Sequence, residues 1–201
     1  MAEWIIGFVE QFGYLGIAAL MALENIFPPL PSELIMPFGG FSAAQGTLSL
    51  AGVIAAGTCG SLLGALPWYF AGRWLGRDKL ERWIERHGRG FTITQAEHAR
   101  ARRWFERHDA RAVLLGRMVP AVRTVISVPA GVTRMAFGRF LFWSAIGSAA
   151  WSGLLALLGS TLGSHYKEVA SWMNPVTTLI VVGVVVSYIY RVVSFKPDAE
   201  R

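Results

Sequence analysis

Apolar segments without any charged residue alternate with short charged segments along this chain. The uncharged segments are residues 34–72, 124–133, 140–164 and 172–190. A helix needs about 20 mainly apolar residues to span a membrane, and the last two segments have that length. The first is too long for one span, and PFGG at 37–40 and QGT at 45–47 interrupt it. The pattern therefore predicts an all-α polytopic membrane protein. Its transmembrane helices are expected at residues 48–72, 137–164 and 172–193.

The N-terminal segment has a different pattern. Residues 1–12 carry apolar side chains at helical spacing, together with acids and no basic residue. A cleavable signal peptide begins with a basic region, so none is expected here. We predict a short amphipathic helix at the membrane interface for residues 1–12. The apolar run that follows, residues 13–23, is too short to span a membrane.

The formal net charge of +6 is concentrated in one segment. Residues 73–111 contain 11 Lys or Arg and 6 Asp or Glu, and so carry +5 of that total. Loops rich in Lys and Arg stay cytoplasmic, and Arg191 and Lys196 place the C-terminus on the same side. This bias explains the basic pI of about 10 better than nucleic-acid binding does. We expect a multi-pass protein of the inner, cytoplasmic membrane with no nucleic-acid partner.

Two amphipathic helices are expected within the basic cytoplasmic segment, residues 73–111. RDKLERWIERHG has apolar residues at helical spacing and stops at Gly88. The second helix begins after Thr94, with Glu97 three residues on, which is a capping-box pattern. Such helices can lie along a surface of anionic lipid headgroups. A plain solvated arm fits the pattern equally well.

An internal repeat links the two halves of the chain. GSLLGALPWYFAGRWLG at 60–76 and GSAAWSGLLALLGSTLG at 147–163 share five identical residues at a constant offset of 87. A Pro-x-Gly precedes each copy, at 37–39 and at 129–131. The first long helix must end at the basic segment and the second must begin near it, so the copies run in opposite directions. Inverted repeats with proline-broken helices are the architecture of secondary transporters.

Each half also contains a charged segment with prolines. LENIFPPLPSE at 23–33 places Glu24 and Glu33 on either side of three prolines, which prevent one continuous helix. The second segment, at 112–131, centres on GRMVPAVRT, and the apolar flanks of both segments are too short to span. We therefore predict re-entrant hairpins at residues 13–47 and 112–133, a form that is tolerated where it is buried in protein or lines a cavity. The residues expected to shape the hairpins are Pro28, Pro31 and Pro120.

Charged residues at membrane depth are costly and indicate function. One hairpin carries two carboxylates and the other two guanidinium groups, and a pseudo-two-fold would bring the tips together. Arg117 and Arg123 each offer a planar fork that can bind a phosphate. Glu24 and Glu33 are expected to balance these charges and to exchange protons, because burial favours a neutral carboxyl group and a nearby arginine favours its anion.

Two further polar residues and the remaining titratable residues complete the candidate chemistry. Ser32 and Thr124 lie beside the two motifs, where they could donate hydrogen bonds to a phosphate or cap a hairpin arm. Cys59 is the single cysteine, which excludes an intramolecular disulfide. The four histidines are scattered and no phosphate-binding Gly-x-x-x-x-Gly-Lys loop occurs. We therefore expect no metal and no cofactor.

The two charged motifs together resemble the DedA family of membrane proteins, the family of the SNARE-associated Golgi, or VTT, domain. They read ENxxPPxPSE at 24–33 and GRxxPxxRT at 116–124, and the resemblance covers roughly residues 10 to 195. It implies a membrane lipid translocase that moves undecaprenyl phosphate or another phospholipid, in dependence on the proton motive force. The family's acidic pair would fall on Glu24 and Glu33. Its arginine pair would fall on Arg117 and Arg123, which we predict hold the phosphate headgroup of the anionic lipid. Met118 and Ala121 depart from the family pattern, which bears on loop packing rather than on charge.

The residues leave other functions open. A proton-coupled transporter of small solutes or drugs would use the same architecture. The four charges could also form a static ion-pair network, or the chain could be a membrane scaffold. An enzyme is disfavoured, because only fragments of a lipid phosphatase site are present, at Arg102, His108 and Ser164-His165. The expected partners are therefore membrane lipids and protons, with no oligomeric state predicted.

Overall fold

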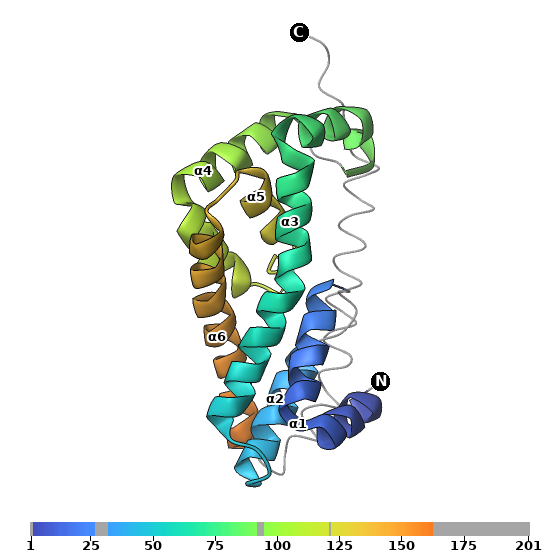
Figure 1. The fold of residues 1–201 in the computed structure, drawn as a ribbon, viewed down its shortest axis with the longest axis vertical. Coiled ribbons are helices and arrows are strands. Elements are labelled where there is room, and N and C mark those ends of the chain that lie inside the picture. Colours follow the sequence, from blue (N-terminus) through green and yellow to red (C-terminus); the bar gives the residue numbers. More distant parts are fainter. Residues whose placement is uncertain (1, 27–31, 92–94, 121, 163–201) are drawn as a thin grey trace.

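The computed structural model describes residues 2–26, 32–91, 95–120 and 122–162, and they are all-helical (Figure 1). The predicted transmembrane helix at 172–193 lies outside the described residues, as do Pro28 and Pro31. The described helices are α1 Ala2–Ile26, α2 Ser32–Ala44, α3 Leu50–Phe91, α4 Gln95–Arg117, α5 Ser127–Val132 and α6 Phe137–Leu162.

Three of these helices have segments long and apolar enough to cross a membrane: Trp4–Ile26, Leu50–Gly76 and Phe137–Leu162. The second and third correspond to the spans expected at 48–72 and 137–164. The first joins the predicted interfacial helix to the first arm of the predicted hairpin. The backbone of Gly13 leaves the helical region there, with φ 55° and ψ −128°, so α1 is broken at this residue. A positive φ costs glycine little because it has no Cβ.

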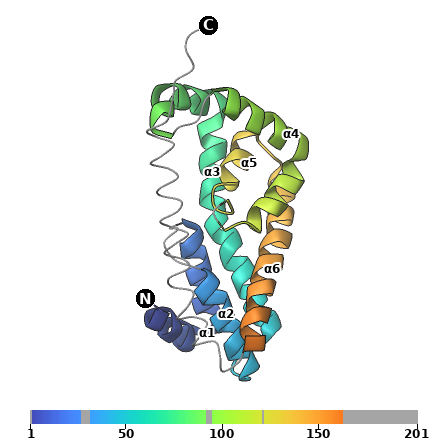
Figure 2. The ribbon, with the colours of Figure 1, turned by 180° about the vertical axis from the view of Figure 1, so that it is seen from behind.

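The basic segment at 73–111 is helical in its described part, and its second helix begins at Gln95, as the capping-box pattern at 94–97 predicts. The other predicted boundaries are wrong. α3 breaks at Gly76 (φ 67°) and then continues to Phe91, beyond the expected stop at Gly88. α4 runs through the expected boundary at residue 111 and is broken at His108 instead. The last part of α3 and the first part of α4 lie across one end of the molecule (Figures 1 and 2). Directly after the break, the side chain of Asp109 accepts from the N–H of Ala110 at 2.6 Å.

Glycines let the two longest apolar helices approach the short ones closely. A Cβ on Gly159 of α6 would overlap the carbonyl oxygen of Pro37 on α2, and a Cβ on Gly72 of α3 would overlap that of Val128 on α5. The contacts are reciprocal, because Gly40 of α2 lies against α6 and Gly131 of α5 lies against α3 in the same way. Small residues at such crossings are typical of helix packing in membranes. On α5 the glycine in close contact is Gly131, the glycine of the second Pro-x-Gly. On α2 it is Gly40, which follows Gly39, the glycine of the first Pro-x-Gly.

Two apolar clusters fill the interior, and a polar layer separates them. One cluster lies where α1 and α2 pack on α3 and α6, and the other where α3 and α6 pack on α4 and α5. Along α3, Ser61 lies between Val53 of the first cluster and Ala65 of the second. Along α6, three buried serines lie between the clusters: Ser144, Ser148 and Ser152. The polar layer therefore lies near the middle of both long apolar helices.

Candidate functional site

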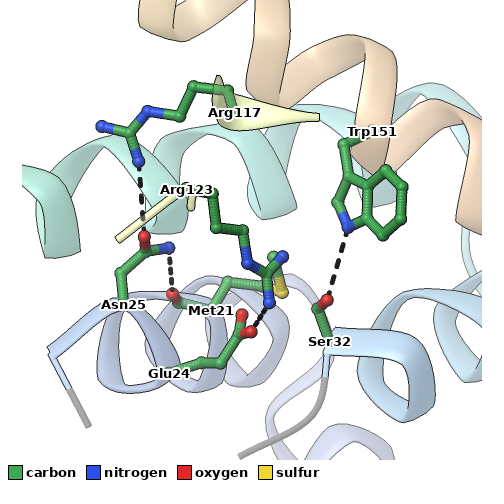
Figure 3. A network of polar contacts seen from close by, with 7 residues as sticks. All are labelled: Met21, Glu24, Asn25, Ser32, Arg117, Arg123 and Trp151. Carbon is green, nitrogen blue, oxygen red and sulfur yellow. Dashed lines mark hydrogen bonds and ion pairs between the residues drawn. The ribbon is translucent and has the colours of Figure 1, made fainter. Parts of the chain in front are cut away.

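The charged residues of the site lie where helices end inside the molecule. Glu24 and Asn25 occupy the last turn of α1, which ends at Ile26. Arg117 is the last residue of α4, and Pro120 follows three residues later, where a proline prevents the helix from continuing. Turns then lead the chain back toward α5, with the N–H of Arg123 donating to the carbonyl oxygen of Val119 at 2.9 Å. Figure 3 shows Arg117 and Arg123 on one side of the site and Glu24 and Asn25 of α1 on the other, with Arg123 beside Glu24.

Glu24 and Arg123 form a buried ion pair between the two halves of the chain. An Nη2 of Arg123 contacts Oε1 of Glu24, and the two side chains are 7% and 4% exposed. Two charges removed from water in this way need each other, because a buried charge left alone is strongly unfavourable. Oε2 of Glu24 has no hydrogen-bond partner among the described residues. The carboxylate therefore keeps one acceptor oxygen open.

Arg117 is the largest fully buried side chain of the described residues, and its contacts are with neutral groups. One Nη donates to Oγ of Ser127 at 3.0 Å and the other lies 3.4 Å from Oδ1 of Asn25. The guanidinium carbon lies 5.8 Å from the centre of the Phe140 ring, within the range of a cation–π interaction. Gly147 provides the space for this side chain, since a Cβ there would lie 2.7 Å from Cβ of Arg117. Nε of Arg117 has no partner among the described residues.

Asn25 connects the site to two helices. Its Nδ2 donates to the carbonyl oxygen of Met21 at 3.2 Å, which directs Oδ1 toward Arg117 (Figure 3). Its own carbonyl oxygen accepts from Nε1 of Trp68 on α3 at 2.8 Å. That bond satisfies one of the carbonyl groups that a helix end leaves without an intrahelical partner. Asn25 is 1% exposed, so both its backbone and its side chain are fixed.

The structure brings only some of the predicted site residues together. Glu24, Arg117 and Arg123 gather in the polar layer, whereas Glu33 is half-buried in the first turn of α2 and forms no ion pair with either arginine. Ser32 is buried and accepts from Nε1 of Trp151 at 3.4 Å (Figure 3). Thr124 is half-buried on the turn that follows Arg123. Pro120 is exposed on the same turn.

Several residues of the site were not identified from the sequence. Asn25 lies in the motif at 24–33 but the sequence predicts no role for it, and the sequence does not single out Ser127 or Phe140. Ser144 follows Phe140 by four residues and precedes Gly147 by three, so it lies on the α6 face that Arg117 contacts. Its buried hydroxyl has no partner among the described residues. Serines at 144, 148 and 152, four residues apart in an uncharged helix, were the available signal.

Comparison with known proteins gives one family. A family model of the VTT domain matches residues 30–161. Undecaprenyl phosphate transporter A of Staphylococcus aureus (strain NCTC 8325 / PS 47) is 32% identical over 201 residues, covering 100% of this chain and 99% of that protein. The protein of the same name in Bacillus subtilis (strain 168) is 32% identical over 190 residues, covering 94% and 92%. No solved structure matches significantly.

A relative with a different name has similar coverage. The alkaline phosphatase-like protein of Lactococcus lactis subsp. lactis (strain IL1403) is 36% identical over 196 residues, covering 97% of this chain and 92% of that protein. The Staphylococcus and Bacillus relatives are thus named as transporters, whereas the Lactococcus relative is named after a phosphatase. The domain match and these full-length relatives agree with the motifs at 24–33 and 116–124. The chain belongs to the VTT-domain, or DedA, family of membrane proteins.

Proposed function

We propose that this protein is a translocase that carries an anionic lipid, undecaprenyl phosphate or a related phospholipid, across the cytoplasmic membrane. The observation that carries the proposal is the buried charge cluster of Glu24, Arg117 and Arg123 in the polar layer between two apolar clusters. A lipid phosphate needs cations at membrane depth to replace its lost hydration. The undecaprenyl phosphate transporters among the relatives support this choice of cargo.

The proposal includes an inverted repeat with two re-entrant hairpins. α1 beyond Gly13 and α2 form the first hairpin, and the second part of α4 and α5 form the other. The reciprocal glycine contacts support it, because α2 lies against α6 in the same way as α5 lies against α3. In this arrangement the broken helix ends line the substrate path, as they do in other transporters. The basic segment at 73–111 and the C-terminus face the cytoplasm.

The mechanism follows from competition for the arginines. In the resting state Glu24 holds Arg123. A phosphate that reaches the cluster through its side offers both guanidinium groups an acceptor, and it displaces the carboxylate. Glu24 then takes up a proton when the headgroup carries two negative charges, because this leaves the occupied site without net charge. Release of the lipid on the other side lets Glu24 lose the proton and return to Arg123, and Glu33 at the start of α2 offers a second carboxyl group for proton exchange.

The test is transport in reconstituted vesicles. Purified protein is placed in liposomes containing a polyprenyl phosphate, and an impermeant phosphatase added outside reports how fast inner-leaflet lipid becomes accessible. Arg117→Lys, Arg123→Ala, Glu24→Gln and Glu33→Gln are compared with the wild type. The control is Arg139→Ala, which removes an arginine that is 57% exposed and paired with Asp109. We expect slow lipid exchange in these four variants and normal exchange in the control. Wild-type rates in all four variants would refute the proposal. If the protein instead transports a small solute, added polyprenyl phosphate should not slow the transport of that solute.

A further inference from the structure

The charges of the buried cluster do not balance. Arg117 and Arg123 are 2% and 6% exposed, and Glu24 is 4% exposed. Glu24 contacts Arg123, whereas Arg117 is held by the neutral groups of Asn25, Ser127 and Phe140. With all three groups ionised, the cluster has a net charge of +1. Each guanidinium remains protonated at any ordinary pH.

No other charged side chain of the described part of the molecule cancels this excess. The elements packed around Arg117 contribute few charges: α5 has none, and Glu33 on α2 is half-buried without an ion pair to either arginine. Arg73 on α3 donates to the hydroxyl of Tyr69 and adds positive charge, not negative. The remaining described charges on these elements are the exposed Glu10, the exposed Arg107, Arg111 and Arg134, and the pair of Arg139 with Asp109.

We propose that Arg117 is an uncompensated cation that makes the resting site selective for the charge of the headgroup. With Glu24 ionised, the cluster is neutralised by a headgroup with one negative charge. A headgroup with two negative charges is neutralised only when Glu24 takes up one proton. This inference rests on the proposed function and deepens it, because it states which headgroups require a proton and which do not.

The physical basis is the cost of a buried net charge. An isolated ion in a low-dielectric interior is strongly unfavourable, so the occupied site favours the protonation state that brings its total charge to zero. A phosphodiester carries one negative charge, whereas a phosphomonoester carries about 1.5 to 2 at pH 7 because its second pKa is about 6. Monoester lipids should therefore bind with proton uptake at alkaline pH, and diester lipids should bind without it.

The open donor atoms fit an acceptor at this place. Nε of Arg117 and Oγ of Ser144 have no partner in the described residues. Ser144 lies between Phe140 and Gly147 on α6, and both of these contact Arg117. A phosphate oxygen beside Arg117 would receive hydrogen bonds from both open donors while Ser127 and Asn25 keep the guanidinium in position.

The experiment uses two single-chain probes that differ by one charge, hexadecyl phosphate and hexadecyl methyl phosphate. Each is titrated into full-length protein in phosphatidylcholine nanodiscs at pH 8, and calorimetry in two buffers of different ionisation enthalpy gives the protons taken up. We expect the wild type to take up about one proton with the monoester and none with the methyl ester. Glu24→Gln is expected to bind the monoester with no proton uptake and at least about tenfold more tightly than the wild type.

A second variant tests Arg117 directly. Asn25→Asp places a carboxylate beside Arg117 with almost no change in shape, and it should weaken binding of the methyl ester at least about tenfold. Ser127→Ala is the matched control, since it removes a hydrogen bond to the same guanidinium and leaves the net charge unchanged. It should weaken both probes by the same factor. Thermal unfolding of each variant in nanodiscs shows whether it is folded before it is titrated.

The outcomes separate this inference from the proposed function. Unchanged proton uptake in Glu24→Gln would overturn the inference, because the proton would then bind elsewhere. So would a folded Asn25→Asp that binds the methyl ester as the wild type does. If Asn25→Asp does not fold, proton uptake in Glu24→Gln alone decides. Loss of transport in Arg123→Ala would leave the proposed function standing in either case, whereas normal transport in the cluster variants would remove both.

Discussion

The ion pair between Glu24 and Arg123 can be tested by a double-mutant cycle that separates stability from transport. The variants are Glu24→Gln, Arg123→Met and the double variant. Both side chains are almost completely buried, so removal of one partner leaves the other as a lone charge. Such a change typically costs about 3–5 kcal/mol, whereas replacement of a whole buried pair by neutral groups is often close to neutral.

The two single variants should not cost the same. Glu24→Gln removes the carboxylate and leaves Arg117 and Arg123 as two buried cations, so we expect about 5 kcal/mol of lost stability. Arg123→Met leaves Glu24 and Arg117, whose charges cancel, so the loss should be nearer about 3 kcal/mol. The double variant leaves Arg117 in the neutral surroundings that it already has. It should therefore lie within about 1 kcal/mol of the wild type, giving a coupling of several kcal/mol.

The free energy of unfolding is measured by denaturant titration in mixed micelles, and transport by the vesicle assay. Asp109 and Arg139 provide the control cycle, because this pair is 3.1 Å long but much more accessible, with the side chains of Arg139 and Asp109 57% and 23% exposed. Exposed pairs contribute about 0–1 kcal/mol. Additive losses at Glu24 and Arg123 would refute the reasoning about burial. A stable double variant that transports lipid at the wild-type rate would show that the pair is structural and has no role in transport.

Other contacts of the structure predict further outcomes. Gly159→Ala should destabilise the protein by about 1–3 kcal/mol in the denaturant assay, because its Cβ overlaps a carbonyl oxygen of α2. Gly138→Ala on the same helix, where the new methyl group meets open space, should be neutral or slightly stabilising. Phe140→Leu removes the ring beside Arg117 and should weaken binding of hexadecyl phosphate by about 0.5–2 kcal/mol in a titration. Trp68→Phe removes the hydrogen bond to the end of α1 and should cost about 0.5–1.5 kcal/mol of unfolding free energy.

The long apolar helices could be predicted from the sequence because membrane span is a local property. Each span needs only a sufficient run of apolar residues, and Leu50–Gly76 and Phe137–Leu162 agree with the runs expected at 48–72 and 137–164. The breaks in the basic segment were harder to place. Gly88 was a plausible helix end by composition, whereas Gly76 has the positive φ and His108 has the non-helical backbone.

The site could be predicted as a set of residue types but not as a set of contacts. The sequence indicated that two carboxylates and two guanidinium groups belong together. It did not indicate that Glu24 pairs with Arg123 while Arg117 is held by Asn25, because the partners are 99 and 92 positions apart in the chain. Hydropathy carries no information on which face of a helix end points at which partner. The charge pattern also did not indicate neutral partners such as Asn25, because it suggests only carboxylates as partners for an arginine.

The close helix crossings and the charge cluster depend on each other. Gly72 lies against Val128, which follows Ser127 in sequence, so the approach of α5 to α3 also sets the position of the Ser127 hydroxyl. Gly147 leaves space for the Arg117 side chain against α6, and it thereby sets the position of the guanidinium group that donates to Ser127. A shift of one residue along a helix moves the backbone by about 1.5 Å, which is more than the donor–acceptor distance of the 3.0 Å bond between Arg117 and Ser127 can change without breaking it. A slip of α4 along α6 by a single residue would therefore break the Arg117 contacts, so the small residues that permit close packing also determine where the uncompensated charge lies.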